Sequence, residues 1–292
     1  MKRSFPRSIA PASAPLVAFP GERSEWPLDA DDFAAYYRFS PTALAVRECL
    51  RLRAVRKFDL EPPILDIGCG DGLFATLAYP GKQVWGIDVN LTEIRRAQST
   101  AAYNALICGS ITEVTLPAGF FRSAIANCSL EHVPDLDRAL RNIQRALEPR
   151  AEFITIVPTP HWTRLLAIPE LLRRHGFQGL ADAYGRTLDG IFFHVHLYDG
   201  DEWTRRLERA GFAVKSIETL TSRRSSWVFD ALLYPSLVGW VTKKVTGKWV
   251  IAPALRNLTV DAARAIVNRL AASVEDSDDG SEYLIVAEAV KG

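Results

Sequence analysis

The sequence lacks the features that mark several large classes of protein. Its 292 residues carry a formal net charge of +1, so no excess of basic residues predicts a nucleic-acid partner. It contains four cysteines, Cys49, Cys69, Cys108 and Cys128, and their spacing is not typical of a metal site. Unpaired thiols are what a cytoplasmic protein keeps, so we expect reduced cysteines and a cytoplasmic location.

A continuous apolar run is also missing from the N-terminus. Residues 1–30 are rich in proline, alanine and serine, and four prolines interrupt them by position 20. A secretion signal needs an unbroken apolar core behind its basic start. We therefore expect residues 1–30 to be a disordered leader. The rest of the chain, with an overall apolar content of 48%, is sufficient for an ordinary globular core.

One stretch organises the remaining chain. Residues 64–75, ILDIGCGDGLFA, pass from a short apolar run into three glycines at alternate positions and then into helix-forming residues. This order predicts a buried strand, a tight turn and the N-terminus of a helix. Glycine permits such a turn and lets a ligand approach the backbone closely. The helix N-terminus behind it offers free N–H groups, so the stretch predicts a ligand-binding loop.

A second predicted strand, residues 84–89, places Asp88 at its carboxyl end. Asp88 follows Asp66 by 22 residues, near the spacing at which an acidic residue reaches ribose hydroxyls in dinucleotide folds. The glycines run G-x-G-x-G, however, and Leu73 stands where the dinucleotide fingerprint has its third glycine. A nicotinamide-dependent dehydrogenase is therefore the weaker interpretation of the loop.

Strands alternate with helices along most of the chain. Further strands are predicted at residues 105–108, 123–128, 151–157, 212–218 and 283–289. This alternation predicts an α/β, Rossmann-like, doubly wound sheet with its ligand at the carboxyl ends of the strands. The expected parts are the leader 1–30, a core 31–219 with an N-terminal helical cap and an irregular lid at 158–200, a helical insertion 220–280 and a last core strand at 281–292.

Three motifs in order, LDIGCGDG (65–72), SLEHVPD (129–135) and LEP (147–149), resemble those of class I S-adenosylmethionine (SAM)-dependent methyltransferases. Within that family the chain resembles the methyltransferase type 11 group over residues 63–218 and again at the last strand. The resemblance implies a seven-stranded sheet whose last strand is antiparallel and inserted beside the sixth. It also implies SAM as the cofactor, a small-molecule acceptor and methyl transfer as the reaction.

The resemblance also assigns cofactor-binding residues, position by position. The loop residues Gly68, Cys69 and Gly70 would face the methionine part of SAM, and Asp66 would hold its amino group. Asp88 would accept hydrogen bonds from both ribose hydroxyls, which suits a carboxylate because it has two acceptor oxygens. The other cofactor contacts implied are Val89, Ser110, Ile111, Asn127 and His132.

Some relatives bind a divalent metal through a Glu-x-x-Glu-His cluster. Here Cys128 replaces the first carboxylate, ahead of Glu131 and His132. A hard cation prefers oxygen ligands, so this replacement removes one. We expect no metal site.

The acceptor side of the site is less clearly marked. In FFHVHLY (192–198), His194 and His196 would share one face of an extended segment. A histidine can take a proton from a substrate hydroxyl near neutral pH. His194, His196 and Tyr198 are therefore candidate catalytic residues, with a packed or exposed histidine pair as the alternative. Further candidates for the substrate pocket are Tyr36, Tyr37 and His161.

Two basic segments have more than one interpretation. The helix expected after Pro41 carries Arg47, Arg51, Arg53, Arg56 and Lys57, which favours a solvated basic face over a binding patch. Residues 221–256 hold three of the seven tryptophans and six basic residues against one aspartate. Such a composition suits peripheral contact with the inner face of a membrane. A helical cap over the active site is the rival interpretation.

The leading hypothesis is SAM-dependent methyl transfer to a small, lipophilic acceptor by in-line displacement at the sulfonium methyl. Transfer to oxygen or carbon is favoured over nitrogen because the candidate histidines would act as bases. The alternative is a non-catalytic protein of the same fold that uses residues 221–256 to dock on a membrane or a protein. The intact glycine loop and Asp88 favour the enzyme, since a scaffold need not keep a cofactor site.

Overall fold

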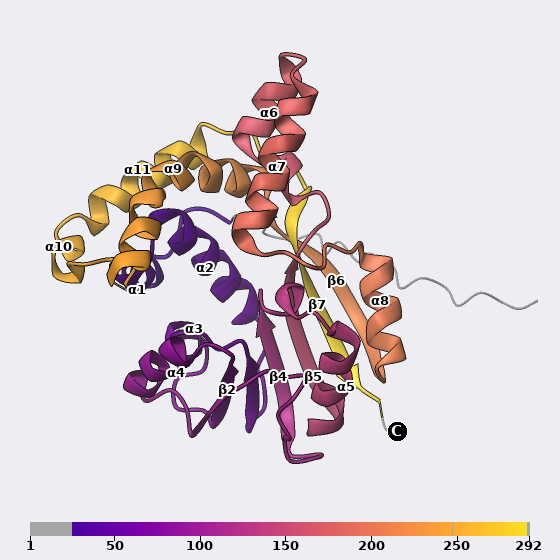
Figure 1. The fold of residues 1–292 in the computed structure, drawn as a ribbon. Coiled ribbons are helices and arrows are strands. Elements are labelled where there is room, and N and C mark those ends of the chain that lie inside the picture. The colour runs from indigo at the N-terminus through magenta and orange to yellow at the C-terminus, as the bar shows by residue number, and fades with distance from the viewer. Residues whose placement is uncertain (1–24, 247, 291–292) are drawn as a thin grey trace, which may run out of the picture.

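A computed structural model describes residues 25–246 and 248–290 and places one seven-stranded sheet at the centre (Figure 1). The strand order is β3-β2-β1-β4-β5-β7-β6. The strands are β1 (Ile64–Ile67), β2 (Val84–Asp88), β3 (Ala105–Cys108), β4 (Phe121–Asn127), β5 (Leu147–Pro158), β6 (Phe212–Ser222) and β7 (Gly280–Ala289). The predicted fold class is confirmed.

The first five strands pair in parallel, and β7 pairs antiparallel with both β5 and β6. In that pairing Ile285 faces Thr155 of β5 and Ile217 of β6. The last strand therefore inserts beside the sixth, as expected. Since parallel strands end at the same edge, the loops after β1, β2, β4 and β5 converge there.

Helices cover both faces of the sheet. The helices of the first half are α1 (Ala30–Phe39), α2 (Thr42–Val55), α3 (Leu73–Ala78), α4 (Leu91–Ala97) and α5 (Leu136–Ala146), and α8 (Gly200–Arg209) follows later. Alternate residues of a strand point to opposite faces, so Ile64 packs with α2 while its neighbour Leu65 packs with α5 and α8. The sheet therefore lies between two apolar cores, one on each face.

A second group of helices lies above that edge (Figure 1). It comprises α6 (Ala167–Arg174), α7 (Gln178–Phe192), α9 (Arg223–Thr246), α10 (Pro253–Asn257) and α11 (Val260–Ala272). The segment expected as an irregular lid is thus largely helical. Pro169 is compatible with α6 because it lies in the first turn, where a backbone N–H has no intrahelical partner. The expected insertion 220–280 begins within β6 and supplies α9, α10 and α11.

The expected leader falls mostly on residues 1–24, which lie outside the described residues. Its last residues are packed, however. Trp26 and Leu28 are 8% and 3% exposed, and the Trp26 indole donates to Ser225 Oγ at 3.2 Å. Residues before position 30 are therefore packed against the rest of the protein, and Trp26 is joined to α9. None of the described helices combines the length and the apolar character needed to cross a bilayer.

Candidate functional site

The glycine loop is tied to the end of β2 by backbone hydrogen bonds. The amides of Gly68 and Cys69 both donate to the carbonyl of Ile87, at 2.8 and 3.0 Å. The amide of Gly70 donates to Asp88 Oδ2 at 3.0 Å. Strand β1, the loop and the carboxylate predicted at the end of β2 therefore form one unit.

Gly68 and Gly70 of this loop have different surroundings. A Cβ atom on Gly68 would lie 2.4 Å from Ser129 Cβ, so Gly68 permits close packing against the turn after β4. A Cβ atom on Gly70 would have no other atom within 4 Å, although φ there is +55°. The space in front of Gly70 belongs to a cavity of about 200 Å³ at the carboxyl end of β1. A ligand can therefore approach the backbone at Gly70.

Asp66 lines this cavity and is 2% exposed. The Tyr103 hydroxyl donates to Asp66 Oδ2 at 2.7 Å. Burial raises the pKa of Asp66 to about 7. The Tyr103 hydrogen bond lowers this pKa and the nearby Asp88 raises it, both by less than burial does. A desolvated carboxylate of this kind attracts a cationic group such as an ammonium.

Two further polar groups of the cavity have no hydrogen-bond partner among the described residues. They are the Tyr36 hydroxyl and Asn127 Oδ1, and both atoms are buried. The Asn127 amide group is oriented by Glu48, whose Oε2 accepts from Nδ2 at 3.0 Å. A carboxylate, an amide and a phenol around an open glycine fit the charged amino-acid end of SAM.

The residues expected around the nucleoside of SAM lie after β2 and β3. Asp88 Oδ1 accepts from the Asn90 amide at 2.8 Å, and each carboxylate oxygen can accept a further bond. Val89 is 71% exposed, which leaves its apolar surface open to a flat ring. Ile111 is buried, and Ser110 Oγ accepts from the Thr112 amide at 3.2 Å.

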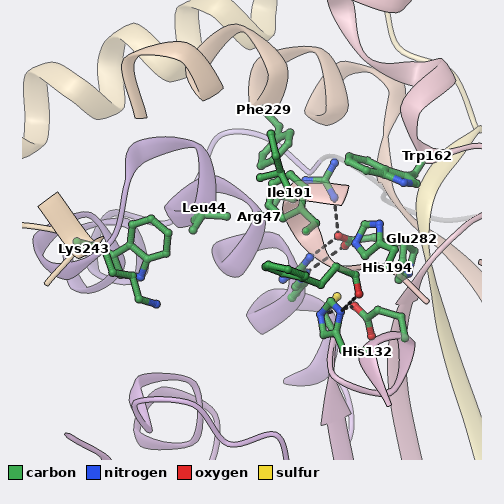
Figure 2. A pocket seen from close by; sticks show the side chains of 16 residues that line it. Leu44, Arg47, His132, Trp162, Ile191, His194, Phe229, Lys243 and Glu282 are labelled. Carbon is green, nitrogen blue, oxygen red and sulfur yellow. Dashed lines mark hydrogen bonds and ion pairs between the residues drawn. The ribbon is translucent and has the colours of Figure 1, made fainter. Parts of the chain in front are cut away.

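A larger cavity of about 610 Å³ adjoins the first, and Leu44 lines both (Figure 2). Its walls come from α2, from the turns after β4 and β5, from the end of α7, and from α9 and β7. Trp162, Ile191 and Phe229 make much of its surface apolar. Lys243 lies at the end opposite Trp162 and His194 (Figure 2).

Buried ion pairs join α2 to β7 at this cavity. Glu282 Oε1 accepts from Arg47 Nη1 at 2.8 Å and also from Arg51 Nη2, and Arg51 Nη1 reaches Glu48 Oε1 at 2.6 Å. Neighbouring Arg51 and Arg47 lower the pKa of Glu282 against the effect of burial. The solvated basic face expected for this helix is wrong for Arg47, which is 6% exposed, and for Arg51, whose side chain is 11% exposed. Both arginines turn inward because β7 places a carboxylate beneath α2.

His194 lines the larger cavity and is held by Asp189. Its Nδ1 lies 3.2 Å from Asp189 Oδ1, which also accepts from the Trp162 indole at 2.8 Å. His132 stacks against His194 with ring centroids 5.8 Å apart. The buried Glu131 lies beside His132, with Oε1 at 3.6 Å from Nε2. Two imidazoles and two carboxylates therefore meet at one end of the cavity.

Burial shifts the pKa values of Glu131 and His132 in opposite directions. It raises the pKa of Glu131 to about 7 and lowers that of His132. The Glu131 carbonyl also accepts from the amides of Val195 and His196, at 2.9 and 3.1 Å. This anchors the loop that carries His194 against the turn after β4.

The other predicted acceptor-side residues do not line either cavity. His196 is bonded through Nε2 to the Val133 carbonyl at 2.8 Å and through Nδ1 to the Tyr198 hydroxyl at 2.9 Å. Tyr37 stacks on Phe33, and His161 is exposed before the 3₁₀ turn at Trp162. The structure thus brings Tyr36, His132 and His194 to the cavities and leaves these residues elsewhere.

Sequence reasoning missed Asp189, Glu282 and Phe229, and it did not place Arg47 in the site. Of the cavity residues outside the predicted set, only Trp162 could have been found from the sequence, because it directly follows His161, a predicted pocket residue. Glu282 lies 235 residues from Arg47, and nothing in the local sequence connects the two. The described residues contain no group of three or more metal-ligating side chains arranged to hold a metal ion.

Comparison with known proteins places this geometry among methyltransferases. The family model described as "Methyltransferase domain" matches residues 36–217. Two uncharacterized methyltransferases, from Mycobacterium tuberculosis and Mycobacterium bovis, are each 33% identical over 89 residues, 30% of this chain and 45% of theirs. A malonyl-[acyl-carrier protein] O-methyltransferase from Pseudescherichia vulneris is 30% identical over 87 residues, 30% of this chain and 35% of its own length. The chain thus spans less than half the length of these curated relatives.

Solved structures share the fold at low sequence identity. A SAM-dependent methyltransferase from Thermotoga maritima superposes with a TM-score of 0.52 at 16% identity, covering 89% of this chain and 94% of its own. The [4+2]-cyclase SpnF superposes with a TM-score of 0.53 at 20% identity, covering 85% of this chain and 82% of its own. At these identities the likeness supports the fold and not a particular substrate.

Proposed function

This chain belongs to the methyltransferase domain family, whose cofactor is SAM, and from that premise we propose that it methylates a small, lipophilic acceptor on oxygen or carbon. One observation carries the proposal. A cavity at the glycine loop, lined by both polar and apolar groups, adjoins a larger, mostly apolar cavity, and Leu44 lines both. A donor in the first cavity and an acceptor in the second would therefore be neighbours.

The residues of the first cavity would bind and orient the donor. Bound SAM would supply an electrophilic methyl group on its sulfonium. Asp66, ionised, would pair with the donor's ammonium, and Asp88 would accept from the ribose hydroxyls while the Gly70 amide keeps it in place. Fixing one reactant in this way converts a bimolecular reaction into an effectively unimolecular one.

The residues of the second cavity would exclude water and hold a proton. Trp162, Phe229 and Ile191 leave little room for solvent around an apolar acceptor. His194 is the proposed general base. If its Nδ1–H donates to Asp189, Nε2 is left as the acceptor of a proton from a hydroxyl or an acidic C–H. Asp189 would then act as a positioning residue that fixes the tautomer.

The malonyl-[acyl-carrier protein] O-methyltransferase among the relatives makes oxygen the first acceptor atom to test. The alternative is a protein that binds SAM without transferring its methyl group. The cyclase among the structural neighbours supports keeping this alternative, because the same fold serves there in a protein described by another activity.

A surface beside the second cavity supports contact with an anionic membrane at its inner, cytoplasmic face. Four apolar residues between the end of α9 and the end of α10 are between 64% and 82% exposed: Val245, Ile251, Leu255 and Leu258, with Lys248 in the same segment. Lys243 and Trp249 of the same segment line the cavity. We call these four apolar residues the α10 patch. An acceptor dissolved in the membrane would reach the cavity from this side.

The test uses SAM with an isotope-labelled methyl group and an organic extract of cells that express the protein. We expect a labelled product soluble in organic solvent, together with an equal amount of S-adenosylhomocysteine. Asp88→Ala should give neither. Binding of SAM without formation of S-adenosylhomocysteine in any extract would contradict methyl transfer and favour the non-catalytic alternative.

A further inference from the structure

Arg47 and Arg51 use their guanidinium groups differently, although they lie one turn apart on α2. Arg51 presents Nε and Nη2 together to Glu282, so the two nitrogens grip both carboxylate oxygens. Arg47 reaches Glu282 through Nη1 alone. Its Nε and Nη2 are buried and have no hydrogen-bond partner among the described residues. The paired edge that Arg51 uses to bind a carboxylate therefore has no hydrogen-bond partner in Arg47 among the described residues.

The surroundings of Arg47 make these two unpartnered N–H groups energetically unfavourable. The guanidinium carbon of Arg47 lies 4.0 Å from the centroid of the Phe229 ring and 5.5 Å from the centroid of the Trp162 ring. Burial among these groups lowers the pKa of Arg47, with Glu282 acting in the opposite direction. A buried cation that keeps two donors unpaired is destabilised, and an added anion would relieve it.

The charges around the cavity also favour an anionic ligand. Arg47, Arg51 and Lys243 line it, against the carboxylate of Glu282 and that of Glu131, whose pKa burial raises to about 7. Lys243 also pairs with Glu93 at 3.2 Å, and Arg51 with Glu48. Arg47 is thus the cation of the cavity with the least complete set of partners. A planar anion with two oxygens matches its unpartnered Nε–Nη2 edge in shape and charge.

We propose that Arg47 is the recognition site for a carboxylate on the acceptor, so that the substrate class is an apolar carboxylic acid. This inference rests on the proposed function, since it names the substrate of the same site. The carboxylate lies on the Nε–Nη2 edge of Arg47 at the Glu282 end of the cavity. The apolar body extends from there past Leu44 toward Lys243, at the other end of the cavity (Figure 2).

The test compares two soluble probes that differ only in the acid group, 4-phenylbutyrate and 4-phenylbutan-1-ol. Each is titrated calorimetrically into the full chain saturated with SAM. We expect the acid to bind about tenfold more tightly or better, since charge-assisted pairs are the stronger hydrogen bonds. Equal affinity of the two probes in the wild-type protein would overturn the proposal without any variant being needed.

Variants assign the preference to one side chain. Arg47→Met should abolish the preference for the acid. Arg47→Lys should retain part of the preference, because an ammonium keeps the charge but lacks the paired donors of a guanidinium. Arg141→Met, which removes an exposed arginine of α5, should leave the preference unchanged. An Arg47→Met protein that binds SAM normally and still prefers the acid would also overturn the proposal. If the wild-type chain fails to bind SAM at all, the failure belongs to the proposed function.

Discussion

The Gly70 amide donates to Asp88 Oδ2 at 3.0 Å, so the residue that leaves space for a ligand also holds the carboxylate that would bind it. Gly70 lies in the loop after β1, and Asp88 is the last residue of β2, 18 positions further along the chain. This bond makes the glycine loop and the end of β2 one preorganised cradle. A substitution at either residue should therefore affect cofactor binding more than folding.

Gly70→Ala should abolish SAM binding at a small cost in stability. The added methyl group would project into the open space of the cavity, where it would meet the ligand. The positive φ of +55° costs an alanine about 1–2 kcal/mol. Gly119→Ala is the matched control, because Gly119 has φ +59°, open space at its Cβ position and no part in the cavity. Calorimetry and thermal melting of both variants make the comparison, and equal SAM affinities would contradict the cradle.

SAM affinity should rise with pH up to about 7 and then level off. The ionised form of Asp66 attracts an ammonium, and its pKa of about 7 keeps it protonated in more acidic solution. Well below that pKa the affinity should change about tenfold per pH unit, and binding should release a proton. Asp66→Asn should bind weakly with no such slope. A wild-type affinity that is flat between pH 5.5 and about 7 would contradict this role of Asp66.

The Asp66 carboxyl group should also influence the stability of the folded protein in the absence of ligand. The folded-state pKa of Asp66 is raised above its ordinary value of 3.8, so the folded protein binds the proton more tightly than the unfolded chain. Its contribution to stability is therefore present below pH 4 and is lost as pH rises to about 7. Asp66→Asn should melt at a higher temperature than wild type at pH 8, and at a similar one at pH 4. A lower melting temperature at pH 8 would contradict the assignment.

His194→Gln should lower kcat by about 10²–10⁴ if His194 is the general base. Asp189→Asn should lower kcat less and shift the pH profile, because it disturbs the tautomer without removing the imidazole. His196→Gln is the control, since both nitrogens of His196 are bonded to Val133 and Tyr198 away from the cavities. A larger loss in His196→Gln than in His194→Gln would reverse the assignment.

The α10 patch should govern attachment to membranes. The double variant Leu255→Glu/Leu258→Glu should not float with phosphatidylglycerol vesicles, because it replaces exposed apolar surface with negative charge that the anionic lipid repels. Leu180→Glu on α7 adds a charge at another exposed leucine and should leave flotation unchanged. Failure of the wild-type protein to float, or equal flotation of all three forms, would exclude the patch as a docking surface.

The placement of the glycine loop, Asp66 and Asp88 at one edge of the sheet could be predicted because its signals are local. The G-x-G-x-G spacing, Asp66 before it and Asp88 at the next strand end occupy 23 consecutive residues, from 66 to 88. Parallel strands bring such neighbours together at one edge whatever the rest of the chain does. The insertion of the last strand followed from the family resemblance and not from the residues themselves.

The acceptor side could not be predicted because its partners are distant in sequence. Arg47 belongs to a helix whose arginines look alike, and only the position of Glu282 on β7 turns it inward. The pairing of His194 with Asp189 depends on the end of α7, which falls in a segment expected to be irregular. His196 has the same sequence signal as His194 and a purely structural set of contacts.

The most direct test of the account is calorimetric titration of the full chain with SAM and, separately, with NAD at pH 7.5. The cradle of Asp66, Gly70 and Asp88 predicts one SAM site per chain, weakened strongly by Asp88→Ala, and no heat from NAD. Binding of NAD, or absence of SAM binding by a folded wild-type protein, would contradict it.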